Sequence, residues 1–443
     1  MAKAASLSRG RSSAAARIDQ AGGANDSGTR RTEILQTAAS LIASSGLRTS
    51  LQEIADAAGI LPGSLYHHFE SKEAILVELI RRYQDDLNRI GQSAQARLDE
   101  PDSRPVAEKI IELGSAIADC AVQHGAALQM SFYEGPSADP ELIKLTQQQP
   151  TAIQEAMLQT LRAGRWSGYI KPDIDLPTLA DRICQTMLQV GLDVMRHNAS
   201  TDQVSELLCR IILQGLAAPP KSGQSPPTDP ALDRSSAFAA ANDVIETWAD
   251  DSDADPSDKV AHIRAVARTE FGRKGYEVTT IRDIASAADL GTGTVYRVIG
   301  SKDELLASIM ESFGRKVEAG WVGVLRSDAT PIAKLDALSW INVNALDRFS
   351  DEFRIQLAWM RQSPPNSPNP GWLYATRLRQ MKSLLSEGIR SGDIRADAPS
   401  TAMLARCVIG LQWIPENILR AIGTRASLLH ARDTVLRGVA VRG

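Results

Sequence analysis

Two short segments of the chain carry hydroxyl, phenol and basic groups at matching positions. One reads LPGSLYHHF from position 61, and the other reads GTGTVYRVI from position 291. Small residues let a helix backbone approach a ligand closely, while hydroxyl, imidazole and guanidinium groups reach phosphates and base edges. The chemistry that these residues offer is therefore noncovalent recognition of nucleic acid in a groove.

Each segment occupies the same place in a longer pattern that occurs twice. Residues 34–46 read ILQTAASLIASSG, and residues 263–275 read IRAVARTEFGRKG, 229 positions later. Residues 50–76 and 280–306 then correspond to each other. Both copies predict an amphipathic helix, a glycine, a Ser/Thr-capped short helix, a tight turn and a second short helix, followed by SK(E/D). This is the order of a helix-turn-helix DNA reader.

The turn residues of the first copy have specific backbone roles. Ser50 and Glu53 predict a capping box at the start of the first short helix. Gly59 permits the positive φ of the turn, and Pro62 suits the first position of the next helix. Leu65 and the phenylalanine four residues later should face the core. The outward positions are Gly63, Ser64, Tyr66 and His67.

The second copy predicts the same local structure with different residues. Thr280 is the expected cap and Asp283 completes the box, while Asp289 stands in place of the turn glycine. Aspartate enters the left-handed region more readily than most residues, so the turn can still form. The outward positions are Thr292, Thr294, Tyr296 and Arg297. Although the chain as a whole has a formal net charge of −4, this copy is locally basic.

The remaining composition is that of a helical protein with reduced thiols. Periodic apolar residues at three- and four-residue spacing predict an all-α fold, and 443 residues exceed what one core usually organises. Four widely spaced cysteines predict buried thiols in a cytoplasmic protein, without disulfide or metal site. We find no apolar run long enough to span a membrane and no cofactor motif.

The predicted domains follow from these patterns and from two Pro/Ser- or Asp-rich stretches at residues 217–236 and 250–258. They are a disordered tail (1–28), a first helix-turn-helix domain (29–89, with the motif at about 51–70), a helical body (90–216), a linker with one helix (217–258), a second helix-turn-helix domain (259–318, with the motif at about 281–300) and a second helical body (319–443).

The quoted motifs resemble the TetR family of transcriptional regulators. The resemblance implies, for each half, a three-helix DNA-binding head and a divergent helical body that forms a dimer interface and encloses an effector pocket. By matching positions it also implies the residues that contact DNA. They are Ser50, Pro62, Gly63, Ser64, Tyr66, His67 and Lys72 in the first head, and Thr280, Thr292, Gly293, Thr294, Tyr296, Arg297 and Lys302 in the second.

Three departures from the family pattern concern the heads. The loop before the first short helix is one residue shorter in the first copy. Leu61 stands where the family often has a polar cap, and Val298 and Ile299 replace a polar residue and a phenylalanine. These departures leave open an alternative function, in which degenerate heads serve as an interaction or dimerisation module and do not read DNA.

Two heads in one chain allow two assemblies. The bodies of one chain pack together as an internal pseudo-dimer that reads two unlike half-sites, or two chains form a homodimer with four heads. Heads of a dimer on DNA lie about 34–36 Å apart, one turn of the duplex. The region between the bodies is long enough for the internal pseudo-dimer, and we expect this arrangement.

The expected function is that of a ligand-responsive regulator of operator DNA. Repression is the expected direction, although the residues alone leave activation open. A hydrophobic small-molecule effector is expected, because the second body concentrates tryptophans in a chain with 5% aromatic residues. Core packing explains the same residues. Candidate pocket residues are Phe132, Tyr133, Trp340, Trp359 and Trp372. The six histidines and four cysteines form no recognisable catalytic set, so an enzyme is not expected.

Overall fold

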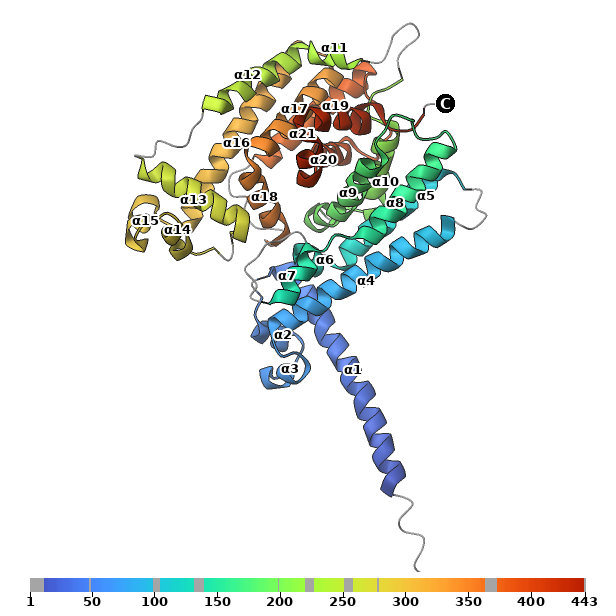
Figure 1. Ribbon diagram of the computed structural model, residues 1–443, viewed down its shortest axis with the longest axis vertical. Coiled ribbons are helices and arrows are strands. Elements are labelled where there is room, and N and C mark those ends of the chain that lie inside the picture. Colours follow the sequence, from blue (N-terminus) through green and yellow to red (C-terminus); the bar gives the residue numbers. More distant parts are fainter. Residues whose placement is uncertain are drawn as a thin grey trace, which may run out of the picture.

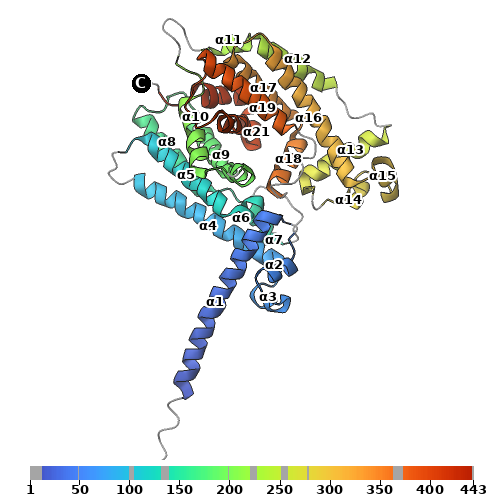
Figure 2. The same cartoon turned by 180° about the vertical axis from the view of Figure 1, so that it is seen from behind.

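The computed structural model describes residues 12–47, 49–98, 104–130, 139–197, 199–219, 227–250, 258–276, 279–362 and 373–441. Every regular element in these ranges is helical, and the only β-type pairs there are two isolated bridges. The predicted all-α class is therefore confirmed. The two halves of the chain lie side by side; in Figure 1 the first head lies below the bodies and the second projects from their left side, and the C-terminus lies at the upper right (Figures 1 and 2).

The first half contains the helices that precede the linker. They are α1 (Ser12–Ser45), α2 (Leu51–Ala57), α3 (Pro62–His68), α4 (Lys72–Leu98), α5 (Val106–Gln123), α6 (Gly125–Met130), α7 (Pro140–Gln147), α8 (Thr151–Trp166), α9 (Leu176–His197) and α10 (Thr201–Gln214). The first three form a head against the start of α4, and α4, α5, α8, α9 and α10 pack into a body.

The second half repeats this order. Its helices are α11 (Asp229–Asp233), α12 (Ser236–Asp250), α13 (Lys259–Lys274), α14 (Ile281–Ala287), α15 (Thr292–Ile299), α16 (Lys302–Arg326), α17 (Pro331–Arg348), α18 (Ser350–Gln362), α19 (Tyr374–Ser391), α20 (Thr401–Leu411), α21 (Glu416–Ala431) and the π-helix η1 (Arg432–Arg437). Helices α13–α15 form the second head, and α16 leads into the second body.

Two segments differ from the expectation. Helix α1 begins at Ser12, inside the segment expected to be a disordered tail, where an alanine run favours helix. The expected linker holds two helices, not one. The additional helix is α11, whose proline lies in the first turn, where a missing backbone N–H is tolerated. Helix α12 packs along α16 and α17 and so forms part of the second body. The expected boundaries at 89/90 and 318/319 fall inside α4 and α16.

The end of each half exchanges backbone hydrogen bonds with the other half in a reciprocal pattern. One bridge joins Ile170 to Ala440 and the other joins Ala217 to Ile394, so equivalent residues swap roles. Lys171 N–H donates to Val439 O (3.0 Å), and Val441 N–H donates to Tyr169 O (2.7 Å); the equivalent bonds run from Arg395 N–H to Leu216 O (2.9 Å) and from Ala218 N–H to Asp393 O (2.9 Å). Val439 N–H donates to Ile212 O (3.0 Å), and Ala440 N–H donates to Leu213 O (2.8 Å). Their equivalents run from Leu216 N–H to Val435 O (2.8 Å) and from Ala217 N–H to Leu436 O (2.9 Å). An exchange in which i contacts j and j contacts i is the signature of a two-fold interface.

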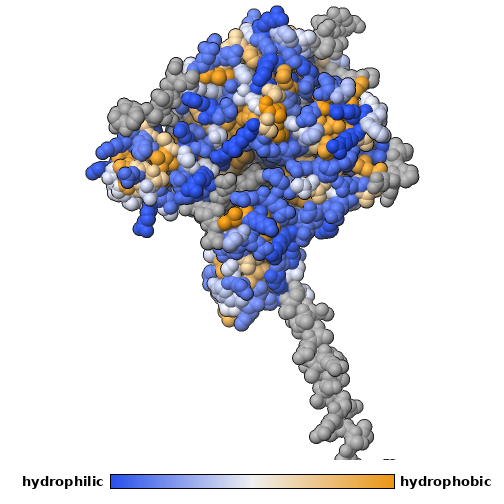
Figure 3. Space-filling view, viewed as in Figure 1, coloured by the Kyte–Doolittle hydropathy of each residue, from blue (hydrophilic) through white to orange (hydrophobic). Residues whose placement is uncertain are grey.

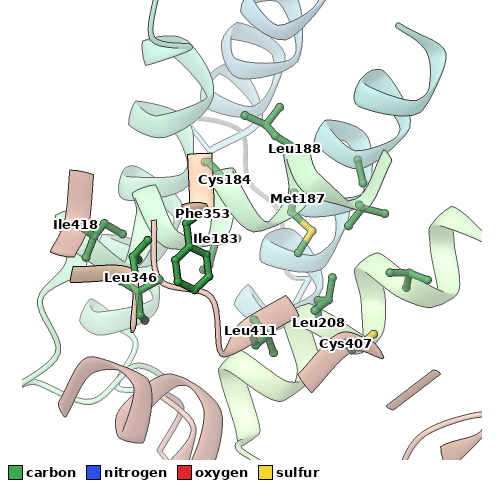
Figure 4. Close-up of a cluster of buried hydrophobic side chains, with 14 of the residues drawn as sticks. Ile183, Cys184, Met187, Leu188, Leu208, Leu346, Phe353, Cys407, Leu411 and Ile418 are labelled. Carbon is green, nitrogen blue, oxygen red and sulfur yellow. The ribbon is translucent and has the colours of Figure 1, made fainter. Parts of the chain in front are cut away.

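The hydrophobic core continues across this junction. Figure 4 shows side chains of α9 and α10 beside those of α17, α18, α20 and α21. Ile183 and Met187 of the first half are buried in one cluster with Phe353 and Leu411 of the second. Buried apolar surface is the main stabilising contribution to a fold, so the two bodies form one folding unit.

The cysteines belong to this core. Cys120, Cys184, Cys209 and Cys407 are free and buried, as expected. Burial raises the pKa of Cys407 to about 12. Thiols with such raised pKa values are packing groups and weak nucleophiles. Among the described residues, no helix combines the length and the apolar character needed to cross a membrane.

Candidate nucleic-acid interface

The first head positions its third helix through a cap and a turn. The backbone N–H of Glu53 donates to Ser50 Oγ at 3.2 Å, and the N–H of Ser50 donates to Glu53 Oε2 at 2.7 Å. Gly59 has φ of 65°, and α3 begins at Pro62. The predicted capping box and turn are confirmed. Because the turn is fixed at both ends, the direction of α3 relative to α2 is fixed too.

The second head reaches the same arrangement with other residues. Asp283 N–H donates to Thr280 Oγ1 at 3.1 Å, and Thr280 N–H donates to Asp283 Oδ2 at 2.8 Å. Asp289 has φ of 54°, the only positive φ of a non-glycine residue in the described ranges. Aspartate therefore replaces glycine in this turn, as predicted.

One side of each third helix is buried and the other is open. Leu65 and Phe69 of the first head and Val295 of the second are in the core. Tyr66 and Tyr296 lie at equivalent positions and are 54% and 53% exposed. On the third helices, the other exposed members of the predicted set are Gly63, Ser64, His67, Thr292, Gly293 and Arg297, while Pro62 and Thr294 are half-buried. Ser50 and Thr280, which cap the second helices, are exposed as well. Figure 3 shows hydrophilic and apolar patches mixed over the first head.

The two predicted phosphate lysines have structural contacts as well. Lys72 Nζ donates to the carbonyl of Leu47, and Lys302 Nζ donates to those of Tyr276 (2.8 Å) and Thr279 (3.0 Å). Burial lowers the pKa of Lys72. Both lysines hold the loop before the capped helix in place. An ammonium group has three donors, so a phosphate contact is compatible with this role.

Two cation–π contacts that support the heads were not found from the sequence. The guanidinium of Arg31 lies 4.3 Å from the centre of the Phe69 ring and pairs with Glu78 of α4. The ammonium of Lys302 lies 4.3 Å from the centre of the Tyr276 ring. Cation–π contacts join residues that are far apart in sequence, so no local spacing indicates them.

The capping carboxylates make the heads sensitive to acid. The backbone N–H and hydroxyl of Ser50 lower the pKa of Glu53, and the hydroxyl and N–H of Thr280 lower that of Asp283. A carboxyl whose folded-state pKa is lowered stabilises the fold above its unfolded value and loses that effect as the pH falls through the folded value. We therefore expect α2 and α14 to be less protected at pH 3 than at pH 7.

Hydrogen exchange of the α2 and α14 amides, compared at each pH with the variant Glu53→Gln/Asp283→Asn, measures this effect. The advantage of the wild type should be smaller at pH 3 than at pH 7. Glu70→Gln, at an exposed position outside both boxes, is the control and should match the wild type throughout. A wild-type advantage of the same size at both pH values would contradict the assignment.

The candidate effector residues are dispersed. Trp340 lies between α17 and α12, where its Nε1 donates to Asn242 at 2.8 Å and its ring stacks on Phe238. Trp359 on α18 is partly buried against the core. Phe132, Tyr133 and Trp372 lie outside the described residues. The two described candidates, Trp340 and Trp359, thus have packing partners, and the predicted apolar pocket stays a prediction.

A capped helix, a positive-φ turn and an exposed third helix, present twice in an all-α chain, define a helix-turn-helix DNA-binding protein. Residues 34–79 and 263–309 match the model of the bacterial regulatory proteins of the tetR family. The chain belongs to this family and is a DNA-binding transcriptional regulator with two helix-turn-helix heads.

The matched relatives correspond to about half of this chain, which covers nearly all of their own length. The transcriptional repressor KstR2 of Rhodococcus jostii is 36% identical over 193 residues, which are 43% of this chain and 92% of that repressor. KstR2 of Mycobacterium tuberculosis is 31% identical over 195 residues, 42% of this chain and 93% of the repressor. The solved structure of the ketosteroid transcriptional regulator KstR2 of Mycobacterium tuberculosis is 28% identical, with a TM-score of 0.34, and covers 40% of this chain and 89% of its own.

Proposed function

We propose that one chain is equivalent to a dimeric repressor and reads an asymmetric operator. The observation that carries the proposal is the reciprocal exchange between residues 169–171 and 439–441 and between 393–395 and 216–218. Two separate subunits would make such an exchange through a two-fold interface. Here both sides belong to one chain, so the surface that would recruit a second chain is already covered.

The two heads differ at the positions that face outward. Where the first head presents His67, the second presents Arg297. At the start of the third helix, Leu61 is 77% exposed in the first head, and its equivalent in the second is Gly291. Arginine pairs bidentately with guanine, whereas apolar side chains contact the thymine methyl group. Because of these differences, we expect the two heads to bind operator half-sites of different base sequence.

The remaining predicted contacts bind the backbone of DNA. In this proposal Ser50 and Thr280 sit at the starts of α2 and α14, and Lys72 and Lys302 sit beside the same loops. Phosphate contacts of this kind set position and affinity, and they make binding fall steeply with salt. In this proposal the effector is a small molecule. By analogy with the KstR2 repressors, a chain bound to its operator blocks transcription until the effector releases the chain from the DNA.

Selection of binding sites from random duplex DNA, followed by native mass measurement of the complex, tests the proposal. We expect an asymmetric site with one chain bound. Arg297→Ala should weaken binding by about 1–3 kcal/mol and relax preference in one half-site only. His67→Ala should relax preference in the other half-site only. Arg210→Ala, on the body helix α10, is the matched control and should leave both half-sites unchanged.

Two outcomes would overturn the proposal in different ways. A palindromic site that holds two chains would assign one reading head to each chain and contradict the one-chain arrangement. No enriched site would favour the alternative interaction module. Binding that does not weaken between 50 and 200 mM salt would also argue against phosphate contacts, since several such contacts cost roughly a thousandfold over that range.

A further inference from the structure

The second body contains a break that the first body lacks. Helix α9 runs without interruption from Leu176 to His197, whereas the equivalent stretch of the second half stops at Leu411 and restarts at Glu416. Pro415 immediately precedes the restart. Proline has no backbone N–H and excludes helical geometry in the preceding residue, so the helix cannot continue through this position.

A charged side chain of the other half occupies the break. Arg182 of α9 is fully buried, and its guanidinium donates to the carbonyls of Leu411 and Trp413. The last carbonyls of a helix have no partner within the helix, and a cation at this end is favourable. Arg182 therefore stabilises the interrupted geometry, which makes the break a defined part of the junction between the halves.

A cleft of about 460 Å³ opens beside this break. Its described walls come from both halves: α6, the end of α7 and α9 on one side, and α13, α18 and the start of α21 on the other. Its size is within the range of roughly 300–1,000 Å³ that is usual for small-molecule sites. The cleft is polar on one wall, since Gln129, Gln185 and Gln189 all line it.

The charge on the opposite wall selects a class of ligand. Arg273, Arg354 and Arg420 line it, and Glu416 is the only acidic residue among the described lining residues. Glu416 pairs with both Arg354 and Arg420. Arg354 also pairs with Asp351, and Arg273 pairs with Glu270. Those two carboxylates do not line the cleft, so its described lining surface presents three guanidinium groups and one carboxylate. Guanidinium groups match carboxylate and phosphate oxygens in geometry as well as charge.

A buried acceptor on the glutamine wall has no donor. Gln129 is 3% exposed, and within the described part of the chain its Oε1 accepts no hydrogen bond. An unsatisfied buried carbonyl costs free energy, and a hydroxyl donor from a molecule in the cleft would relieve this cost. The cleft thus offers sites for an anionic group on one side and for hydrogen-bonding substituents on the other.

The same walls touch the first helix of each head. Gln129 Nε2 donates to the carbonyl of Ala43 in the last turn of α1 at 3.0 Å. Gly272, Arg273 and Gly275 at the end of α13 line the cleft directly. Helices α6 and α18, which carry these walls, also pack against each other. A molecule that changed the width of the cleft would shift both heads relative to the bodies.

We propose that this cleft between the halves binds a small anion, a carboxylate or phosphate compound that bears hydroxyl groups, and that its occupancy changes the placement of the heads. Only the second part rests on the proposed function. The break beside the cleft has no counterpart in α9, which runs without interruption. Two identical subunits would carry such a break twice or not at all, so the one-sided arrangement belongs to the fused chain.

Calorimetric titration of the full chain without DNA tests the site. The probes are glucose 6-phosphate, which carries phosphate and hydroxyl groups, and citrate, which carries carboxylates and a hydroxyl. Uncharged glucose is the ligand control. We expect at least one anion to bind and glucose not to bind. Arg420→Gln, at a largely exposed position, should weaken that anion about tenfold or more through loss of a charge-assisted contact.

Arg425→Gln on the same helix is the matched control, because Arg425 pairs with Asp233 and does not line the cleft. It should bind the anion as the wild type does. Binding of neither anion, or equal loss in Arg420→Gln and Arg425→Gln, would overturn the site. If an anion binds but operator affinity is the same with and without it, the coupling is wrong and the site stands. If the chain binds the anion but no DNA, the proposed function fails separately.

Discussion

Replacing Gly438 by alanine is expected to lower the free energy of unfolding by at least about 3 kcal/mol. This glycine has φ of 74° and ψ of 150°, a region that side-chain-bearing residues reach only at a cost of about 1–3 kcal/mol. A Cβ there would lie 2.2 Å from the carbonyl carbon of Gln214 and 2.4 Å from the nitrogen of Gly215. The backbones must separate, and the reciprocal hydrogen bonds beside them, about 1 kcal/mol each, would weaken.

Gly215 is the equivalent position of the first half and should behave alike, since its own Cβ would lie 2.4 Å from the carbonyl carbon of Arg437. Gly410→Ala is the matched control: no atom lies within 4 Å of its added Cβ, and the helix there should be unchanged or stabilised by under about 1 kcal/mol. Urea denaturation of the three variants provides the comparison. Similar midpoints for Gly438→Ala and Gly410→Ala would show that the interlocked ends contribute little.

Replacing Arg432 by methionine is expected to lower the free energy of unfolding by about 3–5 kcal/mol. Arg432 is fully buried and binds Asp336, itself 1% exposed, through two hydrogen bonds of 2.8 Å. It also binds Asp233 and Asp229 of α11, so one guanidinium joins the linker to α17 and η1. Burial alone would disfavour the charged arginine, but the hydrogen bonds from it to Asp336 and Asp233 raise its pKa.

Without Arg432 the carboxyl of Asp336 loses its hydrogen-bonded cation in a buried site, where desolvation already raises its pKa. The double variant Arg432→Met/Asp336→Leu should therefore recover most of the loss, because a buried pair can be replaced by apolar groups at little cost. Arg425→Met removes an exposed partner of Asp233 and should cost under about 1 kcal/mol. Thermal and urea denaturation would measure all three, and a double variant as unstable as Arg432→Met would contradict this account.

Local sequence was sufficient for the heads. Both capping boxes, the positive φ at Gly59 and Asp289, and the buried positions of Leu65 and Phe69 agree with the sequence-based predictions. Capping and turn formation depend on residues three or four positions apart, so both can be recognised directly in the sequence. The same short range explains why the duplication and the all-α class were predictable.

The bodies were predictable only in outline. The role of Arg182 depends on a helix end 229 positions away, and that of Arg432 on Asp336 and the linker. Neither arginine has a spacing that indicates its partner. The tryptophans allowed either core packing or an apolar pocket, and only the structure shows that Trp340 is engaged by Asn242 and Phe238 through tertiary contacts.

By itself the sequence determined that this chain is helical, that it is duplicated, and that each half carries a helix-turn-helix head, because these properties arise from short-range patterns. Only the tertiary structure decided that residues 169–171 exchange backbone hydrogen bonds with 439–441, that 393–395 do so with 216–218, and that a polar cleft opens at the broken helix. Both depend on how the two bodies pack, and packing is set by shape and burial across positions that no local pattern connects.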